Sequence, residues 1–172
     1  MLFQTVSGGN FITPNSAVLN NVTFDRSSGS GTITTHIGSD MTILGDLSLT
    51  NNGTGAFITQ SSVSGTPRTL TVGGNLNFPS TAATGTLYFG YNGGTTFILS
   101  AVLSGDMALS DSGAQLYGDI TFVSSGTQTI SKHASASISS FSDWYDTGSG
   151  NLALTADFSS SQTLHTDNDS DF

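Results

Sequence analysis

Short runs of alternating apolar and polar residues recur along the chain, and turn-forming residues separate them. In the clearest copies an alternating segment reaches a Gly, then an Asp or Asn, and then alternates again: MTILGDLSL (41–49), LTVGGNLNF (70–78) and AVLSGDMAL (101–109). Weaker copies are AVLNNVTF (17–24), LYGDITF (116–122) and GNLAL (150–154). A period of two is typical of strands with one buried face, so we expect a β-strand on each side of every such turn.

A second frame, consisting of a small residue, a Gly and a strand-like run, follows the first. Its copies are SGTITT (30–35), TGAFIT (54–59), TGTLYF (84–89), SGAQLY (112–117) and SGTQTI (125–130), and SSSQTL (159–164) fits without the glycine. Counted from Asn20, the first-frame turns lie 25, 29, 31, 13 and 32 residues apart. The period is therefore loose, and its one short step indicates a half-repeat.

The turn positions of the first frame are expected to be structural. They are Gly45 and Asp46, Gly74 and Asn75, Gly105 and Asp106, Gly118 and Asp119, and Gly150 and Asn151. Glycine adopts the positive φ angles of tight turns, and Asp or Asn there bonds its own backbone. This explanation accounts for the aspartates without invoking catalysis.

Repetition of the same local pattern predicts an all-β fold, a parallel β-solenoid (β-helix) of about six irregular coils. One unit cannot bury its apolar face alone, whereas coils stacked about 4.8 Å apart pair their strands and share one interior. The predicted interior is Met41, Ile43, Leu47, Leu49, Leu70, Val72, Leu76, Phe78, Ala101, Leu103, Met107, Leu109, Ile120, Phe122, Leu152 and Leu154. The alternative is an antiparallel β-sandwich, whose strands also recur every 8 to 12 residues.

Composition limits the partners of this chain. Residues 1–172 fit a single domain, which we expect to be a segment of a longer chain or a fibre subunit. The net charge is −9 and the only basic side chains besides histidine are Arg26, Arg68 and Lys132, so no basic stripe binds a nucleic acid. No apolar run is long enough for membrane insertion. The chain has no cysteine, which excludes disulfides, thiolate zinc sites and cysteine nucleophiles.

The repeats resemble those of bacterial surface and secreted β-solenoid proteins, including autotransporter passengers and filamentous-haemagglutinin-like adhesins. The matching segments are LTVGGNLNF, LSGDMAL, ITFVSSGTQTIS and GSGNLALTADFSSSQTL, within a chain of which about half is Ser, Thr, Gly and Asn. The resemblance implies an extracellular or cell-surface structural or adhesive element without enzymatic activity. Its expected partners are other copies of itself, by end-to-end or lateral assembly, and surface glycans or neighbouring cells.

The segment 132–147 departs from the repeat and is predicted to be an irregular aromatic loop, or else a widened coil. It contains Trp144 and Tyr145 beside Asp143 and Asp146, a set that could stack on a sugar ring and bind its hydroxyls. A carbohydrate-binding module is therefore the alternative function. The other explanation of these rings is an aromatic plug over an exposed core edge.

Two kinds of site chemistry remain as weaker hypotheses. A polysaccharide-degrading β-helix enzyme would need paired carboxyls or a basic residue beside an acidic site, and the sequence contains no Asp-Asp pair. We therefore predict no catalytic residues. In the acidic tail 165–172, Asp167, Asp169 and Asp171 match the opening of a calcium loop, but the following Gly and distal acid are missing. We expect no cofactor, with calcium as the one candidate.

Overall fold

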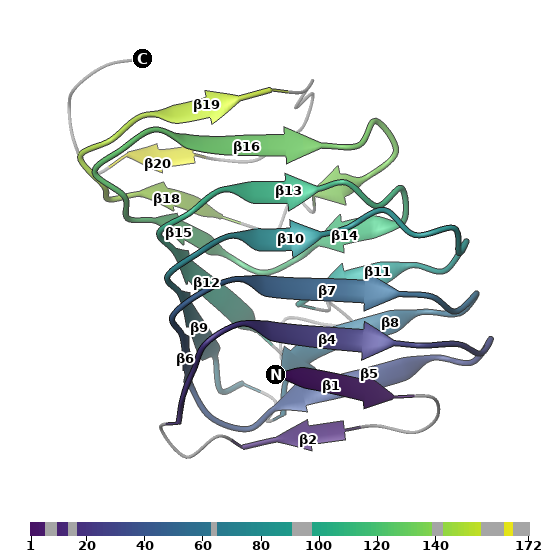
Figure 1. Ribbon diagram of the computed structural model, residues 1–172. Helices are drawn as coiled ribbons and strands as arrows, with labels where there is room; N and C mark the ends of the chain where they lie inside the picture. Colours follow the sequence, from purple (N-terminus) through teal and green to yellow (C-terminus); the bar gives the residue numbers. More distant parts are fainter. Residues whose placement is uncertain are drawn as a thin grey trace.

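The structure is a computed structural model that describes residues 1–5, 10–13, 17–62, 65–90, 98–138, 143–155 and 164–166. These residues form twenty β-strands and no helix, and all of their strand pairs are parallel. The chain visits three sheets in turn, so each sheet takes every third strand as far as β19, and the last described strand, β20, joins sheet C beside β18 (Figure 1). The predicted parallel β-solenoid is confirmed, and the antiparallel sandwich is wrong.

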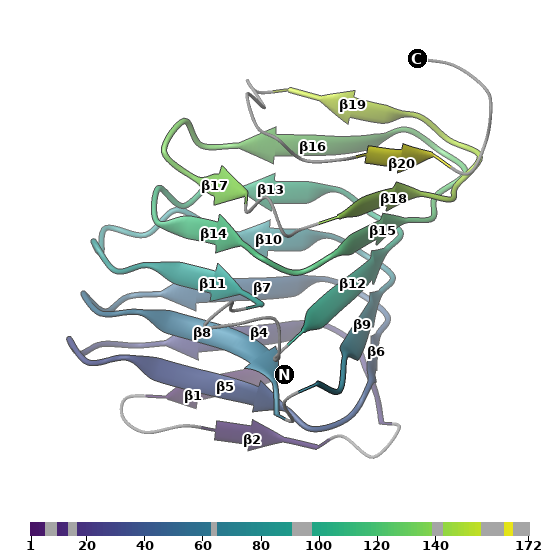
Figure 2. The same ribbon diagram turned by 180° about the vertical axis from the view of Figure 1, so that it is seen from behind.

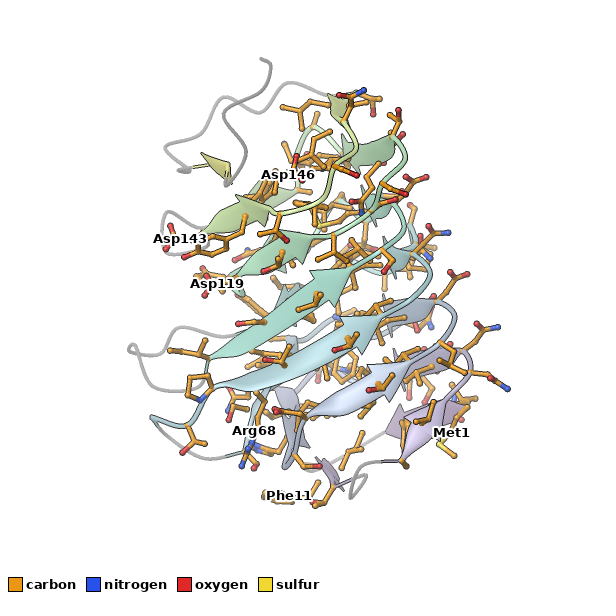
Figure 3. All side chains as sticks on the ribbon, turned by 90° about the vertical axis from the view of Figure 1, so that its left-hand side faces the viewer. Met1, Phe11, Arg68, Asp119, Asp143 and Asp146 are labelled. Carbon is orange, nitrogen blue, oxygen red and sulfur yellow. The ribbon has the colours of Figure 1, made fainter. Side chains whose placement is uncertain are left out.

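Each sheet forms one side of the column. Sheet A, in front in Figure 1, runs β1 (Leu2–Thr5), β4 (Val22–Arg26), β7 (Leu47–Asn51), β10 (Leu76–Phe78), β13 (Met107–Leu109), β16 (Gln128–Lys132), β19 (Leu152–Leu154). Sheet B, in front in Figure 2, runs β2 (Asn10–Ile12), β5 (Ile33–Ile37), β8 (Phe57–Ser61), β11 (Leu87–Phe89), β14 (Ala114–Leu116), β17 (Ser137–Ile138). Sheet C, toward the viewer in Figure 3, runs β3 (Val18–Leu19), β6 (Met41–Ile43), β9 (Arg68–Val72), β12 (Leu99–Leu103), β15 (Ile120–Phe122), β18 (Trp144–Asp146), β20 (Leu164–Thr166).

One apolar interior runs through the column. Alternate residues of each strand point inward, and parallel register stacks them in columns such as Val22, Leu47, Leu76, Met107 and Ile130. The predicted interior residues are buried as far as Phe122. Leu152 is only partly buried and Leu154 is exposed, because they lie on β19, the last described strand of sheet A.

The first repeated frame marks the corner between sheets C and A. Here the backbone N–H of Gly45 donates to Asn20 O, that of Gly74 to Gly45 O, and that of Gly105 to Gly74 O. A side chain at Gly105 would come within 2.6 Å of the Gly74 carbonyl carbon. Glycine therefore recurs at this corner because successive backbones approach each other closely, and not because of a positive φ.

The second frame marks the corner between sheets A and B. The exceptions are Gly126 of this frame and Gly118 of the first frame, which each lie at a different corner from the other copies of their frame. Gly31, Gly55, Gly85 and Gly113 follow sheet A strands, as the frame predicts. Gly118, however, lies between β14 and β15, at the corner between sheets B and C, whereas Gly126 precedes β16 and stacks beneath Gly150.

This exchange removes the predicted half-repeat. The C-to-A corner recurs at Gly105, Gly126 and Gly150, which are 21 and 24 residues apart. The corner near Gly126 lacks the usual Asp or Asn and is closed by Gln128 instead. Its Nε2 donates to Leu103 O, and its Oε1 accepts the N–H of Ser124.

The segment 132–147 was also predicted incorrectly. It is not an irregular aromatic loop, because it contains β17 and β18, which continue sheets B and C. These strands have only two and three residues, and short polar residues and alanines surround the first of them. So short an alternation is not distinguishable from a loop by sequence.

Candidate functional site

The aromatic segment does not form the predicted sugar-binding surface. Trp144 is aligned with Ile120 and points into the interior, where it is 5% exposed. Its ring packs edge to face on Phe122 at a centroid distance of 5.9 Å. A buried ring cannot stack on a glycan, so the predicted use of Trp144 is wrong. Because Trp144 is an inward position of β18, burying its large apolar surface stabilises the last coils instead.

The other members of that predicted site point in different directions. Tyr145 alternates with Trp144 and so faces outward from sheet C. Asp146 shares the inward side with Trp144, and its Oδ1 accepts the N–H of Gly148 at 3.2 Å. Asp143 lies at the corner before β18, beside Asp119 of the preceding coil (Figure 3). The four residues therefore do not converge on one ligand position.

Asp119 and Asp143 are neighbours in successive coils at the corner between sheets B and C. The Oδ1 of Asp119 accepts the backbone N–H of Asp143 at 3.0 Å. Burial raises the pKa of the Asp119 carboxyl, the hydrogen bond from Asp143 opposes this, and the negative charge of Asp143 adds to the rise. The folded state therefore holds the Asp119 proton more tightly than the unfolded chain does.

Because the pKa of Asp119 is raised, replacing Asp119 with asparagine should increase the stability of the fold, by an amount that depends on pH. The stability that the protonated Asp119 contributes is present below its unfolded pKa and is lost as the pH rises through the folded pKa. Asparagine keeps the accepting oxygen and removes the charge. We expect D119N to raise Tm by about 1–2 °C at neutral pH and to leave it unchanged near pH 3, where both proteins are uncharged at this position. Circular-dichroism melting at both pH values measures this, and an equal shift at both would contradict it.

The aspartates and asparagines of the C-to-A corner form a ladder between coils. The side-chain oxygens of Asn21, Asp46, Asn75 and Asp106 accept the backbone N–H groups of Asp46, Asn75, Asp106 and Thr129, at 2.7–2.9 Å. The expectation that Asp46 and Asp106 bond their own backbone is thus replaced by a bond to the next coil. Amide and carboxylate alternate along the ladder, which keeps like charges from being direct neighbours.

The last predicted turn also joins successive coils. The N–H of Gly150 donates to Ser124 O at 3.1 Å, and Asn151 O accepts the N–H of Gln128 at 2.8 Å. The structural role predicted for the turn positions is therefore served by hydrogen bonding between coils.

The A-to-B corner contains a second set of polar residues, which the sequence did not reveal. Arg26 is fully buried, and its Nε and Nη1 donate to the carbonyls of Ser28 and Ala56. In the coil that contains β16, the Nζ of Lys132 donates to the carbonyls of His133 and Ala136. Both cations thus hold turn carbonyls, which explains their place in a chain with few basic residues.

Asn51 and Asp111 complete the inner side of this corner, and both are buried. Asn51 Nδ2 donates to Gly55 O and Thr86 O, each at 2.9 Å, while its Oδ1 accepts the N–H of Gly53. Asp111 instead accepts the N–H groups of Gly113 and Thr81. The only sequence signal for this set is a polar residue at or just after the end of a sheet A strand, with no repeated identity.

The predicted calcium residues Asp167, Asp169 and Asp171 lie outside the described residues. Within the described ranges, no group of three or more His, Cys, Asp or Glu side chains could hold a metal ion. The same ranges contain no helix that is long and apolar enough to span a membrane.

The observed sheets and corners define a class, a three-sided parallel β-solenoid whose coils are joined by side-chain hydrogen bonds at all three corners. No protein-family profile, curated protein or solved structure matches the chain.

Proposed function

We propose that this chain is a non-catalytic structural rod of the cell surface or extracellular space, with outer faces available for adhesion. The observation that carries the proposal is the continuous parallel pairing through three sheets, supplemented by bonds between coils at the corners. In such a column each coil contacts only its neighbours, and a load along the axis is shared by three ladders and the corner bonds.

The extracellular assignment rests on composition and resemblance. Only 9% of residues are charged, and Ser, Thr, Gly and Asn make up about half of the chain, as in the surface repeat proteins that it resembles. The outward residues of sheet C include Thr42, Thr71 and Thr121, which lie in one row across the strands with Val102 between the last two. Hydroxyls on a regular surface suit contact with glycans or other cell-surface material.

Location and catalysis are tested separately. Antibodies raised against the purified chain should label intact source cells or their secreted matrix as strongly as permeabilised cells. Labelling that appears only after permeabilisation would overturn the extracellular proposal. Incubation with a panel of polysaccharides should release no reducing ends, and release that increases with protein concentration would replace the structural role with an enzymatic one.

A further inference from the structure

The N-terminal end of the column carries an apolar rim. Its three edge strands, β1, β2 and β3, each present one exposed apolar side chain: Leu2, Phe11 and Val18. In register, these three align with Thr23, His36 and Thr42 of the next coil. Phe11 is 73% exposed and stacks on His36 at 4.7 Å. The outer surface is therefore apolar at the end coil and polar one coil further in.

Inside this rim lies an open apolar depression of about 580 Å³. Its apolar lining is Met1, Leu2, Phe3, Phe11, Ile12, Ala17 and Leu19. The depression is the end of the interior column, since Phe3 is aligned with the buried Phe24 and their rings lie 5.5 Å apart. Side chains of one more coil would fill it in the way that each coil covers the one before.

The rim also lacks the charged side chains that usually protect an exposed sheet edge. No Asp, Glu, Lys, Arg or His occurs among residues 1–24, although the whole chain has a net charge of −9. Natural sheet edges are commonly guarded by lysine, proline or inward-pointing charges that prevent edge-to-edge pairing. Among the described residues, β1, β2 and β3 pair on one side only, which leaves their other backbone groups available to a further strand.

The opposite end presents a surface in matching register. Leu154 is aligned with Ile130 and so extends the column of Met107, Leu76 and Val22, in which all earlier members are buried. Met1 precedes Leu2, which is aligned with Thr23, and Met1 O accepts the N–H of Thr23, so Met1 extends the same column below Val22. The two end residues are exposed, Met1 at 65% and Leu154 at 51%. In Figure 3, Met1 and Phe11 lie on opposite sides of the N-terminal end.

From these observations we propose that the N-terminal end binds the C-terminal end of a second copy of this chain, with Leu154 of one copy packing toward Met1 of the next. The contact is heterologous, so repeated association produces a rod of stacked copies. This inference rests on the proposed structural role and names its partner. A lipid surface fits less well, because it cannot satisfy three rows of edge-strand N–H and C=O groups.

The test uses charge at the two ends. We expect the 172-residue protein to associate with increasing concentration in sedimentation-velocity experiments. The variants F11K, at the N-terminal rim, and L154K, at the other end, should each weaken this association at least about tenfold. The matched control is L44K, because Leu44 is 61% exposed but lies at the corner between β6 and β7, one coil in from the N-terminal edge. L44K should associate like the parent, and circular-dichroism spectra should show that all three variants are folded.

Mixing the two end variants tests the direction of stacking. F11K retains a free C-terminal end and L154K a free N-terminal end, so a mixture should form a one-to-one dimer that neither variant forms alone. A parent protein that stays monomeric at every concentration would overturn the proposal. Dimers of L154K alone would show an N-to-N contact and also overturn it. Monomers that cosediment with phosphatidylcholine vesicles would assign the rim to lipid instead, and none of these outcomes depends on where the protein is located in the cell.

Discussion

Replacing Gly55 with alanine should lower the free energy of unfolding by about 2–3 kcal/mol. Gly55 lies at the A-to-B corner directly over Ser30 and Gly31 of the preceding coil. A Cβ atom there would meet both of their carbonyl groups, and it would lie 2.6 Å from the Ser30 carbonyl carbon. These are backbone atoms, so the clash is not relieved by a change of rotamer and requires the two coils to separate locally.

The matched control for this substitution is Gly31→Ala. Gly31 occupies the equivalent corner position one coil earlier, and an added Cβ would have no neighbour within 4 Å. Alanine there reduces the conformational freedom of the unfolded chain, so a stability change between zero and a gain of about 1 kcal/mol is expected. Urea denaturation followed by circular dichroism gives both values. Equal effects of the two substitutions would show that close approach of coils is not the reason for glycine at this corner.

The sequence predicted the corners best where the same residues recur in the same geometry. The Gly-Asp and Gly-Asn pairs at 45–46, 74–75 and 105–106 meet both requirements of their corner, a close backbone approach and an oxygen that accepts an N–H from the next coil. Alternation on either side then located the strands and most of the buried residues. Those features follow from local chemistry, and they determined the fold class.

The remaining features depend on which corner a turn occupies, and local sequence does not encode that. Gly118-Asp119 has the same letters as Gly45-Asp46, but it joins sheets B and C. A strand of only three residues does not reveal the register of Trp144 with Ile120, so the sequence left open whether this ring stacks on a sugar or covers the core, and the register buries it. Each error came from assigning a turn or a short strand before its neighbour in the adjacent coil was known.

The interior polar residues were unpredictable for a related reason. Asn51 and Asp111 occupy corresponding positions in different coils, two residues beyond Leu49 and Leu109 of sheet A. The first faces two carbonyl acceptors and one N–H donor, whereas the second faces N–H donors. The choice between amide and carboxylate is therefore set by backbone groups of the same turn and of another coil, which only the assembled column brings together.

Because Asn51 faces two carbonyl acceptors, the variant Asn51→Asp should lose much of the free energy of unfolding. The carboxylate would keep the bond from Gly53 N–H but would place negative charge against Gly55 O and Thr86 O, in a site where Asn51 is 1% exposed. Leaving a buried charge uncompensated and two carbonyls without their donor should cost about 3–5 kcal/mol near neutral pH. Urea denaturation measures this loss.

The pH dependence of N51D separates this explanation from a simple packing defect. Burial against two acceptors would raise the carboxyl pKa of the variant above its unfolded value, so folding would bind a proton. The stability of N51D relative to the parent should then increase as the pH falls, because the protonated acid can again donate to one carbonyl.

The control N75D has the same change at the C-to-A corner, where Asn75 Oδ1 accepts the N–H of Asp106. Its cost should stay below about 1 kcal/mol and decrease with added salt, since it only places a partly exposed carboxylate between Asp46 and Asp106. If N51D and N75D lose the same stability at every pH, the buried corner does not discriminate amide from carboxylate, and the hydrogen bonds of Asn51 do not hold adjacent coils together.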